Sequence, residues 1–369
     1  MESFMYPNWI EVDLSAVEHN VKTLIKRTNL PLLAVVKANA YGMGAVEVGK
    51  TAMEAGATSL GVARFYEAMV LRKAGIKAPI LVLGMVTPDE VALAIKQKIT
   101  LTAFSFEYAD MLGQKAAEAN GKLVVHLKVD TGMSRLGIFP EDMGKFAAHV
   151  AAMKHIEIEG MYSHFAMAGT PGHPNTPGAI KLFKLAVANV ADAGIHPKWI
   201  HLANSAGTYF EKDSWFTMNR AGSAVTGIGF RDDVPFPKDL KRALTWKVRL
   251  AMCKDLPLGR GISYGHKYFA TEDQIIGTLP LGYGDGFRRL PGNQVLIDGK
   301  RVPVVGKECM DQCMVRLPKK YPYGTEVVVI GKQGKDEITL EELARLYDTP
   351  EVDISSSINA RVPRVYMRS

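Results

Sequence analysis

Cysteine is scarce in this chain of 369 residues, which contains only Cys253, Cys309 and Cys313. An odd and sparse set excludes a disulfide framework, and the lack of a repeated Cys-x-x-Cys spacing excludes the common zinc patterns. The histidines show no His-Glu-x-x-His or other paired spacing that would bind a metal. We therefore predict reduced cysteines and no catalytic metal.

Long apolar runs are also missing. None approaches the roughly 18 residues that a membrane span needs, and the N-terminal sequence MESFMYPNWIEVD lacks the basic and then apolar layout of a signal peptide. The net charge of +7 comes from 45 basic and 38 acidic residues spread along the chain, without a basic tract that contains aromatics. This distribution predicts a cytoplasmic enzyme that binds small anionic ligands rather than nucleic acid or membrane.

Nucleotide-binding motifs are absent as well. No Walker A pattern occurs, and GRGISYG (259–265) lacks the third glycine and the preceding strand of a dinucleotide fingerprint. The sequence does contain eight short apolar runs separated by amphipathic stretches, and the first stretch offers Asp13 or Ser15 as a helix cap. The runs cover residues 32–37, 59–63, 79–84, 99–104, 122–130, 156–165, 198–205 and 215–223. Such an alternation is typical of a parallel sheet covered by helices, and eight units predict a (β/α)8 barrel.

The sequence pattern changes after RDDVPFPKDL (231–240), where runs rich in β-forming residues are separated by turns that contain glycine. One short helix, TLEELARLYD (339–348), and a basic tail, RVPRVYMRS, complete this part. We predict an α/β barrel domain at residues 11–237 and a mostly β domain at 238–369, with residues 1–10 as a candidate addition to the second domain.

Polar residues gather directly after the predicted barrel strands, where barrel enzymes carry their reactive groups. Alone, each is more often a solvated rim residue or a satisfied histidine; together on one face they predict a site. They are Lys37, Tyr41, Lys128, Asp130, Arg135, His164, His201, Asn204, Ser205, Arg220, Gly222 and Ser223.

A lysine at the end of the first strand is expensive to bury as a cation unless it is used for chemistry. The loops after the seventh and eighth strands, NSAG (204–207) and AGS (221–223), supply a hydroxyl and glycine-permitted N–H groups where barrels commonly bind phosphate. A lysine combined with a phosphate site suggests pyridoxal 5'-phosphate as the cofactor.

The sequence resembles the alanine racemase family in nine ordered blocks that run nearly from end to end. They are VVKANAYG (35–42), LKVDTGMSRLG (127–137), SHFA (163–166), HLANS (201–205), RAG (220–222), ISYG (262–265), GYGDGFRR (282–289), CMDQ (309–312) and RVPR (361–364). The resemblance implies the barrel with a C-terminal β domain, pyridoxal phosphate, a homodimer with shared active sites, and D-alanine production for peptidoglycan.

The resemblance also implies roles for individual residues. Lys37 would form the Schiff base with the cofactor and act as one of two bases, and Tyr264, from the partner subunit, would be the other, with His164 beside it. Arg220 would donate a hydrogen bond to the pyridine nitrogen, oriented by His201. A guanidinium keeps its proton, so the cofactor's electron sink would be moderated.

Further implied roles concern the remaining groups. Arg135 would contact the phenolic oxygen of the cofactor and the substrate carboxylate. Lys128 matches a position that can be carbamylated in the family, with an unmodified lysine as the alternative. The phosphate and cofactor would also contact Tyr41, Asn204, Ser205, Gly222 and Ser223, and the partner subunit would add Tyr283, Met310 and Asp311 to the substrate side.

Three departures from the family pattern concern the choice of substrate. Val352 stands where a phosphate-binding tyrosine is usual, and Met43 and Thr226-Gly227 replace the more common His and Tyr-Gly. Loss of the tyrosine would enlarge the pocket, so a racemase for serine or a broader set of amino acids is the alternative to an alanine racemase. A non-catalytic pyridoxal-phosphate carrier and a cofactor-free binding protein are weaker alternatives.

Overall fold

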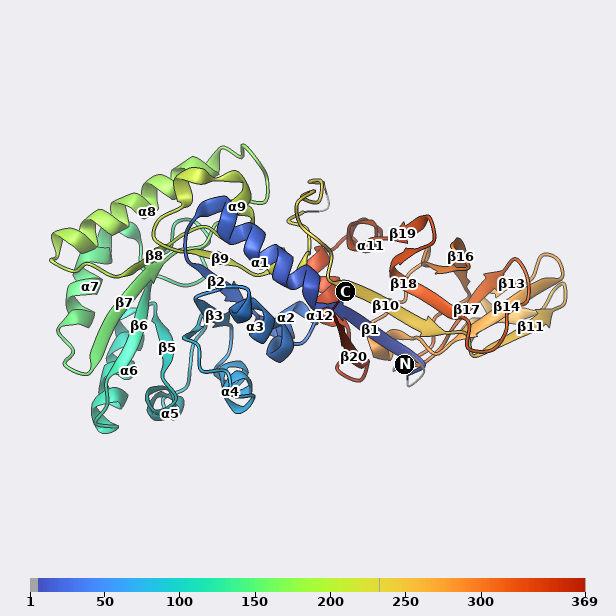
Figure 1. The fold of residues 1–369 in the computed structure, drawn as a ribbon, viewed down its shortest axis with the longest axis horizontal. Helices are drawn as coiled ribbons and strands as arrows, with labels where there is room; N and C mark the ends of the chain where they lie inside the picture. The colour runs from blue at the N-terminus through green and yellow to red at the C-terminus, as the bar shows by residue number, and fades with distance from the viewer. Residues whose placement is uncertain (1–5, 232, 369) are drawn as a thin grey trace.

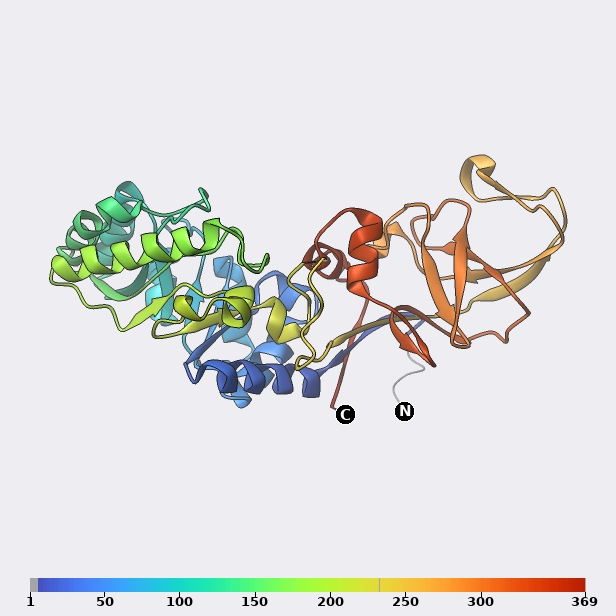
Figure 2. The same ribbon diagram turned by 90° about the horizontal axis from the view of Figure 1, so that it is seen from above.

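The structure is a computed structural model that describes residues 6–231 and 233–368. The chain forms an elongated molecule with two parts, a helix-covered barrel at one end and a β-rich part at the other (Figure 1). The view from above shows the short helices α11 (Leu340–Tyr347) and α12 (Glu351–Ser357) between the two parts (Figure 2).

Within the described residues, eight parallel strands form the barrel, and each lies inside one of the eight predicted apolar runs. They pair in the order β8-β7-β6-β5-β4-β3-β2-β9, which makes a nearly closed ring. Their bounds are β2 (Leu32–Val35), β3 (Ser59–Val62), β4 (Ile80–Val82), β5 (Ile99–Ala103), β6 (Leu123–Lys128), β7 (Ile156–Tyr162), β8 (Trp199–His201) and β9 (Asn219–Ala221). The predicted (β/α)8 class is therefore confirmed.

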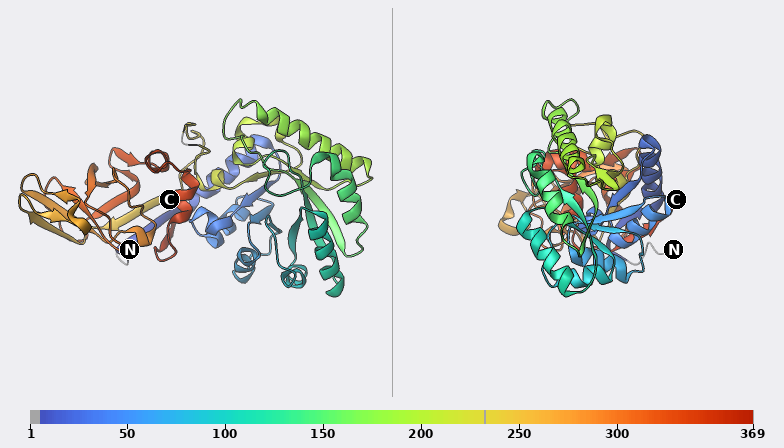
Figure 3. Two further views of the ribbon diagram at one scale, coloured as in Figure 1. Left: turned by 180° about the vertical axis from the view of Figure 1, so that it is seen from behind. Right: turned by 90° about the vertical axis from the view of Figure 1, so that its left-hand side faces the viewer.

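Helices surround these strands, as the view onto the barrel end shows (Figure 3). At the start of α1 (Leu14–Thr28), the Asp13 carboxylate accepts hydrogen bonds from the N–H groups of Ser15 and Ala16, so Asp13 is the cap rather than Ser15. The others are α3 (Ala45–Glu54), α4 (Phe65–Lys73), α5 (Glu90–Lys96), α6 (Phe106–Glu118), α7 (Met143–Ala151), α8 (Asn175–Asp192), α9 (Ser205–Phe210), α10 (Ser223–Thr226), and the 3-10 turns η1 (Pro140–Asp142) and η2 (Lys212–Ser214). The segment labelled α2 (Lys37–Tyr41) is a left-handed turn after β2.

The β-rich part contains a long mixed sheet with the order β11-β14-β17-β16-β15-β18-β10-β1-β20, in which β19 also pairs with β18, and a separate two-stranded sheet of β12 and β13. Its strands and turns are β1 (Asn8–Asp13), β10 (Leu244–Arg249), β11 (Met252–Leu256), β12 (Gly261–Ile262), η3 (Tyr264–His266), β13 (Tyr268–Phe269), β14 (Gln274–Leu279), η4 (Tyr283–Asp285), β15 (Gln294–Ile297), β16 (Lys300–Val305), β17 (Cys313–Leu317), β18 (Glu326–Gln333), β19 (Asp336–Ile338) and β20 (Arg364–Met367). The mostly β second part is thus confirmed.

The first strand, β1, belongs to this second sheet, because it pairs with β10 and β20. Residues 8–10 of the N-terminal segment therefore pack on the β-rich part, whereas residues 1–5 lie outside the described residues. The expected limits of the two domains, 11–237 and 238–369, stay a prediction.

Two elements near the C-terminus differ from the sequence prediction. The expected helix is α11, capped by the Thr339 hydroxyl, but a second helix, α12, follows it. The sequence EVDISSS has low helix propensity, and α12 is held by tertiary contacts instead: the Glu351 carboxylate accepts a hydrogen bond from the N–H of Gly229 at 3.0 Å. The basic tail contains β20, which pairs in parallel with β1.

Candidate active site

The carboxyl ends of the barrel strands surround a cavity of about 1020 Å³. Because α12 reaches over this end of the barrel, Val352 also lines the cavity, although it lies some 300 residues along the chain from the first barrel strand. The predicted site residues that line the cavity are Lys37, Tyr41, Lys128, Arg135, His164, Asn204, Ser205, Arg220, Gly222 and Ser223. The barrel therefore brings together residues from five strand ends.

Lys37 begins a left-handed turn. The φ angles of the four residues from Ala38 to Tyr41 lie between 50° and 55°, a region that costs a non-glycine residue about 1–2 kcal/mol. The Glu67 carboxylate holds the start of the turn by accepting the N–H of Ala38 at 2.6 Å, and the Asn39 side chain accepts the N–H of Ala45 at 2.9 Å. The strained turn is therefore fixed from both sides.

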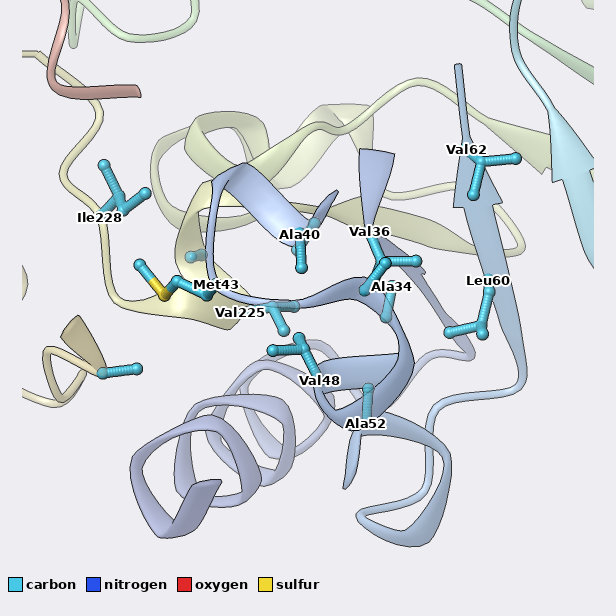
Figure 4. Packing of buried hydrophobic residues seen from close by; sticks show 14 of the residues in the cluster. Ala34, Val36, Ala40, Met43, Val48, Ala52, Leu60, Val62, Val225 and Ile228 are labelled. Carbon is cyan, nitrogen blue, oxygen red and sulfur yellow. The ribbon is translucent and has the colours of Figure 1, made fainter. Parts of the chain in front are cut away.

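Buried apolar residues pack against the same turn. Ala40 and Met43 are fully buried and lie against Val48 and Val225, so the backbone after Lys37 sits on the apolar core (Figure 4). Met43 thus points into the core and does not line the cavity. Of the three departures from the family pattern, only Val352 faces the cavity, which makes it the one relevant to substrate size.

The surroundings of Lys37 favour the neutral form of its amine. Burial lowers its pKa, and the nearby cations Arg135 and Arg220 lower it further, while Glu67 opposes them. A neutral amine is the nucleophilic form, so this environment suits a lysine that forms a covalent bond to a carbonyl group.

Arg220 is buried and held in place by several acceptors. Its Nη1 donates to the carbonyl oxygen of His201 at 2.8 Å and to His201 Nδ1 at 3.0 Å. Its Nη2 donates to the carbonyl oxygens of Ser163 at 2.7 Å and Leu202 at 3.2 Å, and lies 3.4 Å from His164 Nδ1. Among the hydrogen bonds of the described residues, none uses the Arg220 Nε–H, which is therefore available to a ligand.

The two histidines beside Arg220 are neutral. Burial, followed by the charge of Arg220, holds the pKa of His164 and of His201 well below the usual range. The ring of His201 stacks on Tyr162 at a centroid distance of 5.0 Å, which fixes its plane. His201 itself does not line the cavity but contacts two residues that do, Arg220 and Tyr162.

An anion cradle lies at the ends of β8 and β9. The Ser205 hydroxyl oxygen accepts hydrogen bonds from the N–H groups of Gly222 at 3.0 Å and Ala224 at 3.2 Å. A Cβ atom at Gly222 would lie 2.0 Å from the Tyr41 hydroxyl oxygen, so only glycine lets this tyrosine approach. Asn204 shapes the loop by accepting the N–H of Gly207. Because these N–H groups are already bonded, the hydroxyls of Ser205 and Tyr41, which line the cavity, are the donors for a phosphate.

Lys128 ends β6, Arg135 follows it in the next loop, and both line the cavity. Burial, together with Arg220, lowers the pKa of Lys128 to about 7, and its Nζ donates to the Val129 carbonyl oxygen at 2.6 Å. The Asp130 carboxylate accepts three backbone N–H groups of the loop that carries Arg135. Asp130 therefore holds the backbone of this loop in place.

Four predicted site residues lie away from this cavity, in the β-rich part. Tyr264, Tyr283 and Met310 are 67%, 44% and 53% exposed, and Asp311 forms an ion pair with Arg361 at 2.8 Å. They form a second cluster, because the N–H of Tyr283 donates to the Cys309 carbonyl oxygen and the Ser263 hydroxyl lies 3.5 Å from Cys309 Sγ. One chain thus provides two separate groups of site residues.

Two residues of the site are missing from the sequence prediction. Glu67 bridges the ends of β2 and β3 by accepting the N–H groups of Ala38, Ala63 and Arg64. The Tyr162 ring packs against both His201 and Arg220. A carboxylate in the first turn of the helix after a strand, as in ARFYEAM, is the signal that points to Glu67. Tyr162 gives none, because it is an ordinary strand residue.

Comparison with known proteins identifies the family. The family model for the alanine racemase N-terminal domain matches residues 12–229, and that for the C-terminal domain matches residues 243–366. A relative from Symbiobacterium thermophilum, alanine racemase, is 44% identical over 98% of this chain and 97% of its own length.

Solved structures agree with this result. Alanine racemase from Bacillus anthracis with bound L-Ala-P is 37% identical, covers 99% of this chain and 96% of its own, and superposes with a TM-score of 0.94. A histidine racemase from Leuconostoc mesenteroides is 30% identical over 98% of both chains, with a TM-score of 0.91. The site at the barrel mouth and these matches over nearly the whole length place the chain in the alanine racemase family of isomerases.

Proposed function

We propose that the protein interconverts L- and D-alanine with pyridoxal 5'-phosphate held in the barrel cavity, and so supplies D-alanine for peptidoglycan. The observation that carries the proposal is the Lys37 amine, with its lowered pKa, in one cavity with Arg220 and a phosphate cradle. Measuring D/L conversion for alanine, serine and lysine tests it, and the proposal fails if alanine is not racemised.

The residues of the cavity fit this cofactor. Lys37 supplies the amine, while the Ser205 hydroxyl and the close approach of Tyr41 to Gly222 provide the phosphate cradle. The free Arg220 Nε–H suits a ring nitrogen that accepts a hydrogen bond. When bound, the cofactor would supply an electron sink that acidifies the Cα proton of the amino acid.

The protein groups would then manage the proton. Lys37 takes or returns it on one face of Cα, and Arg135 binds the substrate carboxylate. Because the guanidinium of Arg220 donates a hydrogen bond without giving up its proton, the sink stays moderate, which favours proton exchange over transamination. A second base is required on the other face.

We infer that Tyr264 of the partner subunit is this second base, in a homodimer whose two active sites each combine a barrel cavity with the β-rich part of the other chain. The support is the separation of the two clusters and the exposure of Tyr264, Tyr283 and Met310. Exposed apolar groups of this kind mark interaction surfaces, and a two-fold dimer would complete both sites at once.

We expect Val352→Tyr to narrow the choice of substrate. Val352 lines the cavity, and filling an apolar pocket by one group changes discrimination by about 1–3 kcal/mol, or roughly 10–200-fold. The ratio of kcat/KM for alanine to that for serine or lysine should rise by this amount. Val70→Tyr, at an exposed position of α4, is the control; an unchanged ratio in Val352→Tyr would show that this position does not limit substrate size.

We also propose that Lys128 is carbamylated. A neutral amine is the form that reacts with carbon dioxide, and a pKa of about 7 makes this form abundant at neutral pH. The resulting anion would face Arg135 and Arg220, the cations that lower the pKa of Lys128. The carbamate would replace an unfavourable cation with a paired anion.

Replacing Lys128 with methionine is expected to stabilise the cofactor-free protein without bicarbonate. The pKa is about 7 in the folded chain against 10.5 as the ordinary value, so stability falls as pH drops from 10.5 to 7 and stays constant below. The variant should gain on the order of 3–5 kcal/mol of unfolding free energy at pH 6. Urea titration measures the gain, and bicarbonate should stabilise only the wild type. A wild type as stable as the variant at pH 6, or no bicarbonate effect, would contradict these two expectations.

A further inference from the structure

A line of hydrogen bonds leads from Arg220 through the inside of the barrel to the opposite end. His201 Nε2 lies 2.9 Å from His126 Nδ1, and His126 Nε2 lies 3.3 Å from the Glu159 carboxylate. His126 and His201 are buried at 3% and 0% exposure, whereas Glu159 reaches the other mouth of the barrel, with its side chain 32% exposed.

The chemistry of the two ends fixes the direction of every bond in the line. A guanidinium only donates, so His201 Nδ1 accepts from Arg220 and the proton of this neutral ring is on Nε2. A carboxylate only accepts, so the proton of His126 is on Nε2 and its Nδ1 is free to accept from His201. All three bonds therefore point from Arg220 toward Glu159, and aligned bonds strengthen one another.

The line of hydrogen bonds connects Arg220 to a carboxylate that it does not contact directly. The direct partners of Arg220 among the described residues are carbonyl oxygens and ring nitrogens, and none is a carboxylate. A buried cation without a counter-charge is costly. Glu159 is the carboxylate that the line reaches, and it also faces Lys198 and Trp199, which hold it at the barrel end.

Glycine at position 160 leaves space for the His126 ring. Gly160 pairs with His126 across β6 and β7, and a Cβ atom at Gly160 would lie within 2.6–2.8 Å of the His126 ring. Its backbone does not require glycine by φ, so the space for the ring is what requires it. Glu159 and Gly160 together thus place and orient His126.

We propose that Glu159 is a positioning residue for Arg220 and acts through His126 and His201. The carboxylate selects the tautomers of both rings and so fixes His201 Nδ1 as an acceptor for the Arg220 guanidinium. The inference rests on the proposed function, in which Arg220 contacts the cofactor's ring nitrogen. It adds to that function a residue outside the cavity, at the amino-terminal mouth of the barrel.

The first test uses the cofactor-free protein with ¹⁵N-labelled histidine. Nuclear magnetic resonance should show both His126 and His201 as neutral rings protonated on Nε2. Glu159→Gln, which keeps the shape and removes the charge, should shift the signals of both rings. Glu157→Gln is the matched control, because Glu157 lies on the same strand, is 50% exposed and pairs with Lys122. A ring protonated on Nδ1, or unchanged signals in Glu159→Gln, would overturn the proposal.

The second test measures alanine racemisation per bound cofactor. Glu159→Gln should lower kcat by about tenfold, the scale on which supporting hydrogen-bond partners act, with a smaller change in KM because Glu159 does not contact the substrate. Gly160→Ala, which displaces the His126 ring without removing a charge, should lower kcat in the same way. A purely structural role predicts lost thermal stability with normal kcat.

The outcomes separate this inference from the proposed function. If Glu159→Gln and Gly160→Ala both retain the wild-type kcat, the positioning role is wrong even when the ring signals shift. If the wild-type protein does not racemise alanine, the proposed function and the positioning role fail together, while the resonance experiment still decides whether the line of hydrogen bonds exists.

Discussion

Lys37→Ala is expected to lose more than about 10⁴-fold of the alanine racemisation rate, because one change removes both the covalent attachment of the cofactor and a general base. The cofactor should also lose its covalent link to the protein, which its visible absorption reports. The side chain lies at the mouth of the cavity on a turn held by Glu67, so the fold should tolerate the truncation.

Lys50→Ala is the matched control, since Lys50 is an exposed lysine of the next helix, α3, paired with Glu47. It should leave the rate and the absorption unchanged. If Lys37→Ala kept the covalent absorption, another lysine would carry the cofactor, and Lys128 would be the candidate because it shares the cavity.

Tyr264→Phe is expected to lower racemisation by about 10²–10⁴-fold, the usual contribution of a general acid or base. Only the hydroxyl is removed, and the side chain is exposed within one chain, so folding and cofactor binding should be unaffected. Exchange of the Cα proton with deuterated solvent should persist from the enantiomer whose proton faces Lys37 and fall for the other. Equal loss for both enantiomers would contradict the assignment of one base to each face.

Mixing subunits tests whether Tyr264 acts across the dimer. Lys37→Ala and Tyr264→Phe homodimers should each have strongly reduced activity, but a mixed dimer contains one cavity with Lys37 that faces a wild-type Tyr264. Activity should therefore return after the two variants exchange subunits. Tyr323→Phe, at a tyrosine that is 87% exposed on the same part of the chain, should be active throughout. No recovery despite proven exchange would place both bases in one chain.

Much of the architecture could be predicted because it depends on local patterns. Several barrel strands are short continuous runs of buried apolar residues, as in LLAV and ILV, and such runs are visible in the sequence. Helix α11 and the start of α1 were also visible locally, although the sequence left Asp13 and Ser15 as alternative caps of α1. Residues directly after strand ends, such as Lys37 and Arg220, inherit their place from the barrel topology.

Other features depend on contacts between distant segments. Helix α12 forms because Glu351 binds Gly229, and this contact brings Val352 to the cavity; no local signal in EVDISSS indicates it. The left-handed turn after Lys37 is stabilised by Glu67, which lies 30 residues further along the chain. Strand β1 joins the second sheet because its partners are β10 and β20.

The sequence by itself determined the barrel, the β-rich second part and the lysine at the first strand end, since periodicity and strand-end position are properties of neighbouring residues. Only the tertiary structure decided that Met43 is buried in the core and that Val352 lines the cavity. It also decided that Tyr264 lies away from Lys37 within one chain, and that Glu159 connects to Arg220 through two histidines. The physical reason is that burial, pKa and hydrogen-bond direction depend on which distant groups surround a side chain, and the fold alone sets those neighbours.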